Sequence, residues 1–448
     1  MKSFILLPTG IADVPVEALE GRTPLEAAHT PHLDRLAAKA RVGLVRQVPE
    51  GLRISSDVAV LSVLGYDPRT TDATRGGIEA AGMGVELGPD DLAFRMNFVS
   101  TFRGHLVDFN AGHIGGVEAR LLIEALQAEL GGDGRVSFHP GLGYRNLLVM
   151  HGGRKLRIET VPPQEVQGHA LDDYLPYGPD AAPLLELLER ANAVLAAHDV
   201  NRVRVDLGEN PADRIWPWGA GWRTELEPFG LRTDRSLCIV AAVPLVRGLG
   251  AMMGAEVPLV PGATGYYDTD WNGKLQRALA ALEAHDVVLL HLAAANEACH
   301  ETDVRLKVRV IEEIDRFVVG PLAAALDKRT DVRLYLTTDH MTSTVQREGS
   351  TTHVPFALWG PDVTPMRTPG RFTEAAAAAG DLHVEDGHAM LEYVLGKALP
   401  RPVVVATAAD AASAAGAARR APSTGTTGAP RKPAAPRKRT RSSGEEQP

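Results

Sequence analysis

Side chains that could bind a metal or a phosphate follow three apolar runs of the sequence. They are Thr9 after residues 3–7, Asn296 and His300 after residues 287–292, and Asp339 and His340 after residues 332–337. Reactive groups in open α/β sheets gather on loops at the carboxyl ends of strands. We therefore expect one site at a common sheet edge. An Asp-His pair alone is also typical of a turn, so the spacing by itself names no reaction.

Ser55 and Ser56 precede an apolar, helix-like stretch. A serine at this position is an N-cap by default. The amide donors and the dipole of a helix N-terminus also favour an approaching phosphate, so a nucleophile is the second interpretation. The residues alone leave both open.

The elements that must position these groups indicate an α/β fold. Short apolar runs at 3–7, 236–242, 287–292 and 332–337 are typical of strands buried on both faces, and they alternate with helical patterns such as 274–284 and 306–326. This order predicts a mostly parallel sheet flanked by helices.

The pattern changes between residues 91 and 160. It predicts short strands at 92–99, 105–109, 136–139, 146–150 and 156–160, with one helix at 117–130. We therefore expect an inserted smaller α+β domain. The predicted division is a core of residues 1–85 and 200–403, an insert of residues 86–199, and a tail of residues 404–448.

Composition narrows the class of protein. The chain has 448 residues, of which 44% are hydrophobic and 23% charged, as in ordinary globular proteins. Its two cysteines, Cys238 and Cys299, provide no disulfide framework. No apolar run reaches the ~18 residues of a membrane span, and the first residues carry no export signal. We expect a cytoplasmic protein with no membrane partner.

The charge is unevenly distributed. From residue 411 onward there are eight basic and two acidic residues, a balance of +6. Since the net charge of the whole chain is −9, the remaining residues carry −15. An acidic body argues against a nucleic-acid surface, which leaves the tail as the one weak candidate. The Ala/Pro/Gly-rich tail has few large apolar side chains to bury, so we expect it to be disordered. It is either a weak tether to an anionic partner or a solubilising extension.

Long blocks of the sequence resemble the cofactor-independent phosphoglycerate mutases of the archaeal type. The resemblance is carried by LEGRTPLEAAHTPHLDRLA (19–37), SDVAVLSVLGYDP (56–68), RGGIEAAGMGVEL (75–87), DLAFRMNF (91–98), VDFNAGHI (107–114), GLGYRNLLV (141–149), PADRIWPWGAG (211–221), VPGATGYYDTDWNGK (260–274), KVRVIEEIDRFVVGPL (307–322) and TTDH (337–340). These blocks occur in one order and cover nearly everything except the tail.

The resemblance implies an alkaline-phosphatase-like core, divalent metal ions (Mn²⁺, Mg²⁺ or Zn²⁺) and a serine that is transiently phosphorylated. It implies an isomerase of glycolysis and gluconeogenesis that interconverts 3-phosphoglycerate and 2-phosphoglycerate. Ser56 occupies the nucleophile position of the family, and Arg75 and Arg145 lie in family blocks as candidate clamps for phosphate or carboxylate. Each arginine could equally form a structural ion pair. The implied metal ligands are Ser56, His300, Asp339 and His340.

The sequence departs from the family at several metal-ligand positions. Thr9 and Asn296 stand where the family has aspartates, and Ala293 stands where it has lysine. The nearest histidine after His340 is His353, about four residues or roughly 13 Å of extended chain beyond the family position. Of three ligating carboxylates in the family, only Asp339 remains. One metal, two metals or none are therefore open.

Three functions remain at this point. The first is a phosphoglycerate mutase with a rearranged metal site that recruits Glu297, Asp303 or His353. The second is a single-metal phosphatase or phosphotransferase with another phosphorylated substrate. The third is a non-catalytic descendant that binds a phosphorylated metabolite or a protein. The retained Ser56 and Asp339 favour the first two, and the changed ligands favour the third.

Overall fold

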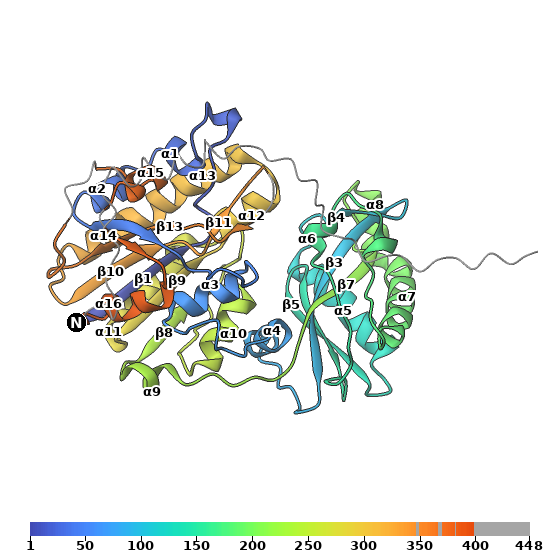
Figure 1. Cartoon of the computed structure of the whole chain (residues 1–448). Coiled ribbons are helices and arrows are strands. Elements are labelled where there is room, and N and C mark those ends of the chain that lie inside the picture. The colour runs from blue at the N-terminus through green and yellow to red at the C-terminus, as the bar shows by residue number, and fades with distance from the viewer. Residues whose placement is uncertain (346–348, 366–369, 381, 398–448) are drawn as a thin grey trace, which may run out of the picture. The chain divides into compact units, whose positions relative to one another are not determined.

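Two β-sheets organise the chain (Figure 1). The computed structural model describes residues 1–345, 349–365, 370–380 and 382–397. The predicted disordered tail, residues 404–448, lies outside these ranges. Within them, no helix has both the length and the apolar character needed to cross a membrane.

The larger sheet has seven strands. Their order is β14 (His383–Val384), β2 (Arg41–Val45), β13 (Val354–Trp359), β10 (Val332–Thr337), β1 (Lys2–Pro8), β9 (Val287–Leu292) and β8 (Leu237–Val240). Four neighbouring pairs are parallel, and β13 runs antiparallel to both of its neighbours. Because β1 lies between β9 and β10, the loops after these three strands meet at one edge of the sheet.

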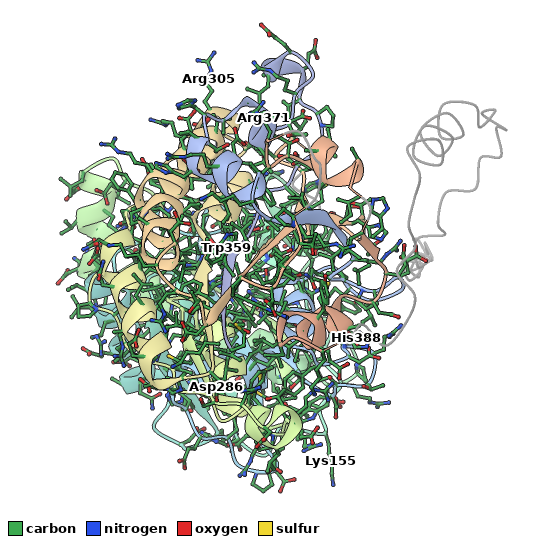
Figure 2. The ribbon with its side chains drawn as sticks, turned by 90° about the vertical axis from the view of Figure 1, so that its left-hand side faces the viewer. Lys155, Asp286, Arg305, Trp359, Arg371 and His388 are labelled. Carbon is green, nitrogen blue, oxygen red and sulfur yellow. The ribbon has the colours of Figure 1, made fainter. Side chains whose placement is uncertain are left out.

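Alternate residues of the central strands pack on opposite faces. Phe4 and Leu6 of β1 belong to a core that includes side chains of α13, whereas Ile5 and Leu7 belong to a core that includes α3 and α10. Helices on both sides explain why the central strands are mostly apolar rather than alternating. Charged side chains such as Lys155, Arg305 and Arg371 instead lie exposed at the surface (Figure 2).

The helices connect and cover the strands. The α-helices are α1 (Pro24–Ala27), α2 (Pro31–Ala37), α3 (Ser56–Val63), α4 (Arg75–Met83), α5 (Gly116–Leu130), α6 (Pro163–Val166), α7 (Ala182–Ala197), α8 (Asp199–Asp206), α9 (Phe229–Thr233), α10 (Pro244–Met252), α11 (Trp271–Ala284), α12 (Ala294–His300), α13 (Val304–Ile314), α14 (Gly320–Leu326), α15 (Glu374–Ala378) and α16 (Met390–Val394). Short 3₁₀ turns are η1 (Glu17–Leu19), η2 (Leu171–Asp173) and η4 (Gly387–Ala389), and η3 (Asp315–Val319) is a π-helix.

The second sheet is antiparallel. It contains β4 (His105–Asp108), β3 (Leu92–Phe102), β6 (Arg145–Met150) and β5 (Val136–Leu142) in that order, and β7 (Arg214–Gly221) also pairs with β3. Its own core includes side chains of α5 and α7. A two-stranded ribbon of β11 (Met341–Thr342) and β12 (Gly349–Ser350) completes the strands. The predicted boundaries at residues 86, 199 and 403 stay predictions.

The predicted α/β class with a mostly parallel sheet is confirmed. Strands expected at 287–292 and 332–337 have those bounds in β9 and β10. The helix expected at 306–326 is divided, because α13 passes into the π-helix η3 before α14 begins. Pro321 in α14 lacks the N–H needed to continue a regular hydrogen-bond ladder.

The strand predicted at residues 156–160 is wrong. Within this stretch only Glu159 forms a β-bridge, and its partner is the single residue Tyr177. Pro162 and Pro163 follow, and neither has an N–H group that could extend the ladder. The apolar alternation of the stretch reflects packing of Leu156 and Ile158 against the second core rather than strand pairing.

Candidate functional site

A cavity of about 830 Å³ lies at the carboxyl ends of β1, β9 and β10. Its lining includes residues from both sheets. The polar and charged lining residues are Thr9, Arg53, Ser55, Ser56, Arg75, Arg95, Tyr144, Arg145, Gln164, Glu165, Gln167, His169, Trp218, His291, Asn296, Glu297, His300, His340 and Thr342. Four arginines and two glutamates are among them, so the lining offers guanidinium groups to an anionic ligand.

Ser56, Asp339 and His340 lie together at this cavity. Ser56 Oγ donates to Asp339 Oδ2 at 3.0 Å, and His340 Nε2 lies 3.4 Å from the same oxygen. Asp339 Oδ1 accepts from the Gly10 N–H at 3.1 Å and from Thr338 Oγ1 at 3.3 Å. The side chain of Asp339 is fully buried. The structure thus brings together three of the predicted site residues around one carboxylate.

Ser56 is the first residue of α3, and Ser55 takes the N-cap position with an extended backbone. The Ser55 side chain makes no capping hydrogen bond. The hydroxyl of Ser56 therefore faces Asp339 at the start of a helix, where free backbone N–H groups and the helix dipole favour a negatively charged group.

The loop after β9 becomes helix α12. His300 at its end lines the cavity, and its Nε2 lies 3.3 Å from the Asn296 side-chain nitrogen. Burial lowers the pKa of His300, which favours the neutral ring. Thr9 is buried and its hydroxyl donates to the Leu292 carbonyl at 3.3 Å, so it turns toward β9. Ala293 also lines the cavity but offers no polar group.

His353, considered above as a recruited ligand, pairs elsewhere. Its Nε2 lies 3.0 Å from Glu385, and it is not among the cavity-lining residues. Glu297 does line the cavity, but its carboxylate is paired with Arg145. Asp303 caps α13 by accepting from the Leu306 N–H at 2.9 Å. Each of these three side chains thus has another partner in the structure.

Two arginines share one buried carboxylate. Glu79 Oε1 lies 3.0 Å from Arg75 Nε and 3.2 Å from Arg95 Nη1, and Arg75 also pairs with Asp57 at 3.2 Å. Both guanidinium groups stack on Trp218, at 4.9 and 5.0 Å from the ring centroid. The two carboxylates and the indole hold the two cations side by side.

Arg145 is held in a second aromatic setting. It forms an ion pair with Glu297, and its guanidinium lies 4.4 Å from the Tyr144 ring and 5.2 Å from the Tyr266 ring. Burial opposes its charge, but Glu297 and the nearby rings raise the pKa of Arg145 above its usual value. Arg145 is therefore a permanent cation at the cavity wall.

The sequence interpretation missed Arg53, Arg95, Trp218 and His291 at this cavity. A signal existed for Arg95, since it is the one charged residue of the otherwise apolar strand pattern LAFRMNF. A buried charge in a strand requires a partner, and here the partner is Glu79. Trp218 faces Arg95 because β7 pairs with β3 in that register. No local pattern could have shown that pairing.

The family implied by the resemblance uses metal ions, and the residues fit one ion better than two. Ligands of a tetrahedral ion at ~2.0–2.1 Å lie roughly 3.3 Å apart. Ser56 Oγ and His340 Nε2 lie 3.0 and 3.4 Å from Asp339 Oδ2, which matches that spacing.

A second ion lacks a comparable ligand set. Across the described ranges, the one group of three His, Cys, Asp or Glu side chains close enough to hold an ion is Cys238, Glu256 and His285, none of which lines the cavity. Two dications at a few ångströms repel by on the order of ten kcal/mol at an effective dielectric near 20, and of the three carboxylate positions of the family this chain keeps Asp339.

Comparisons with known proteins agree on one family. A family model described as 2,3-bisphosphoglycerate-independent phosphoglycerate mutase matches residues 37–201. A probable 2,3-bisphosphoglycerate-independent phosphoglycerate mutase of Geobacter sulfurreducens is 42% identical over 401 residues, which are 89% of this chain and 100% of the relative. The 2,3-bisphosphoglycerate-independent phosphoglycerate mutase 2 of Methanothermobacter thermautotrophicus is 41% identical over 89% of this chain and 98% of its own.

Two solved structures are similar to this one. The PH0037 protein from Pyrococcus horikoshii has a TM-score of 0.69 and 28% identity, and the match covers 90% of this chain and 99% of that one. The cofactor-independent phosphoglycerate mutase from Thermoplasma acidophilum has a TM-score of 0.52 and 28% identity, with 88% of this chain and 100% of that one covered. The similarity extends over both sheets.

Proposed function

Because this chain belongs to the 2,3-bisphosphoglycerate-independent phosphoglycerate mutase family, we propose that it interconverts 3-phosphoglycerate and 2-phosphoglycerate. In this proposal Ser56 carries the phosphoryl group between the two hydroxyls. The observation that carries it is the 3.0 Å hydrogen bond from Ser56 Oγ to Asp339 at an arginine-lined cavity. The phosphatase and non-catalytic alternatives are not favoured by the relatives.

The cavity suits a small, doubly anionic ligand. Its volume of about 830 Å³ is within the range of small-molecule sites. Arg75 and Arg95 both contact Glu79 and Trp218. Arg145 instead contacts Glu297 and two tyrosines. We assign one cation group to the phosphate and the other to the carboxylate, because guanidinium binds both in a bidentate manner.

In the forward direction Ser56 Oγ attacks phosphorus and passes its proton to Asp339 Oδ2. The bond from Oγ to phosphorus forms as the bond from the 3-oxygen of glycerate to phosphorus breaks. The guanidinium groups neutralise charge on the transferring oxygens. His300, whose pKa is lowered by burial, accepts the proton of the 2-hydroxyl on its neutral ring and passes a proton to the departing 3-oxygen, so the ring is unchanged overall. The 2-oxygen then attacks the phosphorus, the bond from Ser56 Oγ to phosphorus breaks, and Asp339 returns its proton to Ser56 Oγ.

A single divalent ion fits beside these groups. Ser56 Oγ, Asp339 and His340 Nε2 would hold it, and Thr342 Oγ1 at 3.1 Å from His340 Nδ1 would orient the imidazole. Such an ion lowers the pKa of a bound hydroxyl and neutralises phosphoryl charge. We propose one such ion for each chain.

The test is formation of 2-phosphoglycerate from 3-phosphoglycerate by the purified chain supplied with Mn²⁺. We expect turnover of an ordinary enzymatic order, roughly ten per second. Ser56→Ala should remove it, whereas Glu86→Gln, an exposed change outside the cavity lining, should retain it within about threefold. Equal turnover by Ser56→Ala and the unmodified chain would contradict the proposal.

A further inference from the structure

Three strands of the second sheet place a serine, a histidine and an aspartate in a row. In the ladder, Leu92 of β3 pairs with Met150 of β6, and Val149 of β6 pairs with Ser137 of β5. One residue beyond the Leu92–Met150 pair, Asp91 therefore lies opposite His151. Ser137 lies diagonally across from His151 on the same face.

The side chains make the contacts that this register predicts. Ser137 Oγ lies 3.0 Å from His151 Nε2, and His151 Nδ1 lies 3.2 Å from Asp91 Oδ2. This is the order nucleophile, base, carboxylate in which serine hydrolases arrange their side chains. None of the three residues lines the cavity described above.

The contacts allow the pair of tautomers that a general base at His151 requires. A proton on His151 Nδ1 donates to Asp91, which leaves the Nε2 lone pair to accept the Ser137 hydroxyl proton. His139 Nε2, at 2.9 Å from Ser137 Oγ, must then donate to that oxygen. Burial, followed by the nearby His151, lowers the pKa of His139, which agrees with a neutral ring there. Only His151 is both free to accept the proton and linked to a carboxylate.

Asp91 is fixed in place. Its Oδ2 accepts from the Gly88 N–H at 2.9 Å, and its Oδ1 accepts from the Gly152 N–H at 3.2 Å. Burial acts to raise the pKa of Asp91, but these two bonds and His151 outweigh it and lower the pKa overall. The carboxylate therefore stays charged, as a group that orients an imidazole must.

The cluster is accessible from solvent. The side chain of His151 is 41% exposed, Ser137 and His139 are partly buried, and Asp91 lies beneath at 9% exposure. An acyl group can thus approach Ser137 without opening the fold. The exposed position of His151 beside Ser137 suits small, unhindered esters.

We propose that Ser137, His151 and Asp91 form a second nucleophilic site that hydrolyses small esters, independent of the phosphoryl chemistry at Ser56. Ser137 Oγ attacks the ester carbonyl carbon while its proton moves to His151 Nε2. The alkoxide leaves with that proton, and an acyl-serine remains. Water then attacks the acyl-serine, gives its proton to His151 and releases the acid, which restores the Ser137 hydroxyl.

The test is labelling of the full chain with a fluorophosphonate, followed by peptide mapping, together with hydrolysis of p-nitrophenyl acetate. In the labelling step the Ser137 Oγ–phosphorus bond forms, fluoride leaves and the proton passes to His151. We expect the label on the peptide that contains Ser137. His151→Gln and Asp91→Asn should each slow both reactions at least tenfold, since general-base catalysis contributes ~10²–10⁴-fold.

His105→Gln is the matched control, because His105 is an exposed histidine of the same sheet whose Nδ1 lies 3.1 Å from the Arg103 carbonyl. It should change both rates by less than about threefold, and the urea midpoint of each variant reports its folding. Ser56→Ala should retain the label at Ser137, which separates this site from the proposed mutase. No label at Ser137, or a label that forms equally fast in folded His151→Gln, would overturn the inference. So would a greater loss with His105→Gln than with His151→Gln.

Discussion

Glu79→Gln should destabilise the chain more than most single substitutions would. The Glu79 carboxylate is fully buried, with Oε1 at 3.0 Å from Arg75 Nε and 3.2 Å from Arg95 Nη1. At these separations Coulomb's law gives about 5 kcal/mol of attraction for each pair at an effective dielectric of 20. Arg75 keeps Asp57 as a partner, whereas Glu79 is the one carboxylate that pairs with Arg95 among the described residues.

Removing one partner of a buried ion pair leaves the other charge uncompensated. The measured cost of such a change is about 3–5 kcal/mol, and we expect that loss in the free energy of unfolding of Glu79→Gln. Urea denaturation at neutral pH measures it, provided that the slope of free energy against urea is unchanged. Glu86→Gln, an exposed change on the same stretch, is the control and should shift stability by no more than about 0.5 kcal/mol. A loss below about 1 kcal/mol for Glu79→Gln would refute the reasoning.

Three further outcomes are expected. Lys307→Met breaks a completely buried pair with Asp13 at 2.8 Å and should lower the free energy of unfolding by about 3–5 kcal/mol in the same urea assay. Thr9→Asp with Asn296→Asp adds carboxylates at two family ligand positions. The affinity for Mn²⁺, measured by calorimetry, should rise by at least about a hundredfold, because changes to residues that only contact a ligand already alter affinity by about 10–100-fold. Unchanged affinity would show that these positions do not face an ion. Burial raises the pKa of Glu374 to about 7, so its contribution to stability is present below pH 4.5 and lost as the pH rises toward 7. Glu374→Gln should therefore match the unmodified chain at pH 4 and exceed its stability at pH 8, and equal stabilities at both pH values would contradict this.

The sequence predicts what depends on local pattern. The runs that form β9 and β10 are mostly apolar because helices cover both faces, and their carboxyl ends meet because β1 lies between them. For this reason Asp339 and His340 could be placed at one edge before the fold was known. The convergence of Ser56 on that edge came from the family resemblance rather than from spacing.

Features that depend on register between distant strands could not be predicted. Arg95 meets Trp218 only because β3 pairs with β7, more than a hundred residues away. Ser137, His151 and Asp91 look unrelated in sequence and align only in the ladder of three strands. The same non-local dependence explains the wrong strand at residues 156–160, whose apolar pattern finds no neighbouring strand to pair with.

The central claim is that Ser56 accepts the phosphoryl group of phosphoglycerate. The most direct measurement is rapid acid quenching of the purified chain with 3-phosphoglycerate and Mn²⁺, followed by mass spectrometry of the peptide that contains Ser56. The account predicts a phosphoryl group on Ser56 within the first turnover, and its absence in Asp339→Asn, whose amide is a far weaker proton acceptor. Formation of 2-phosphoglycerate with no phosphoryl group on Ser56 at any quench time would contradict it.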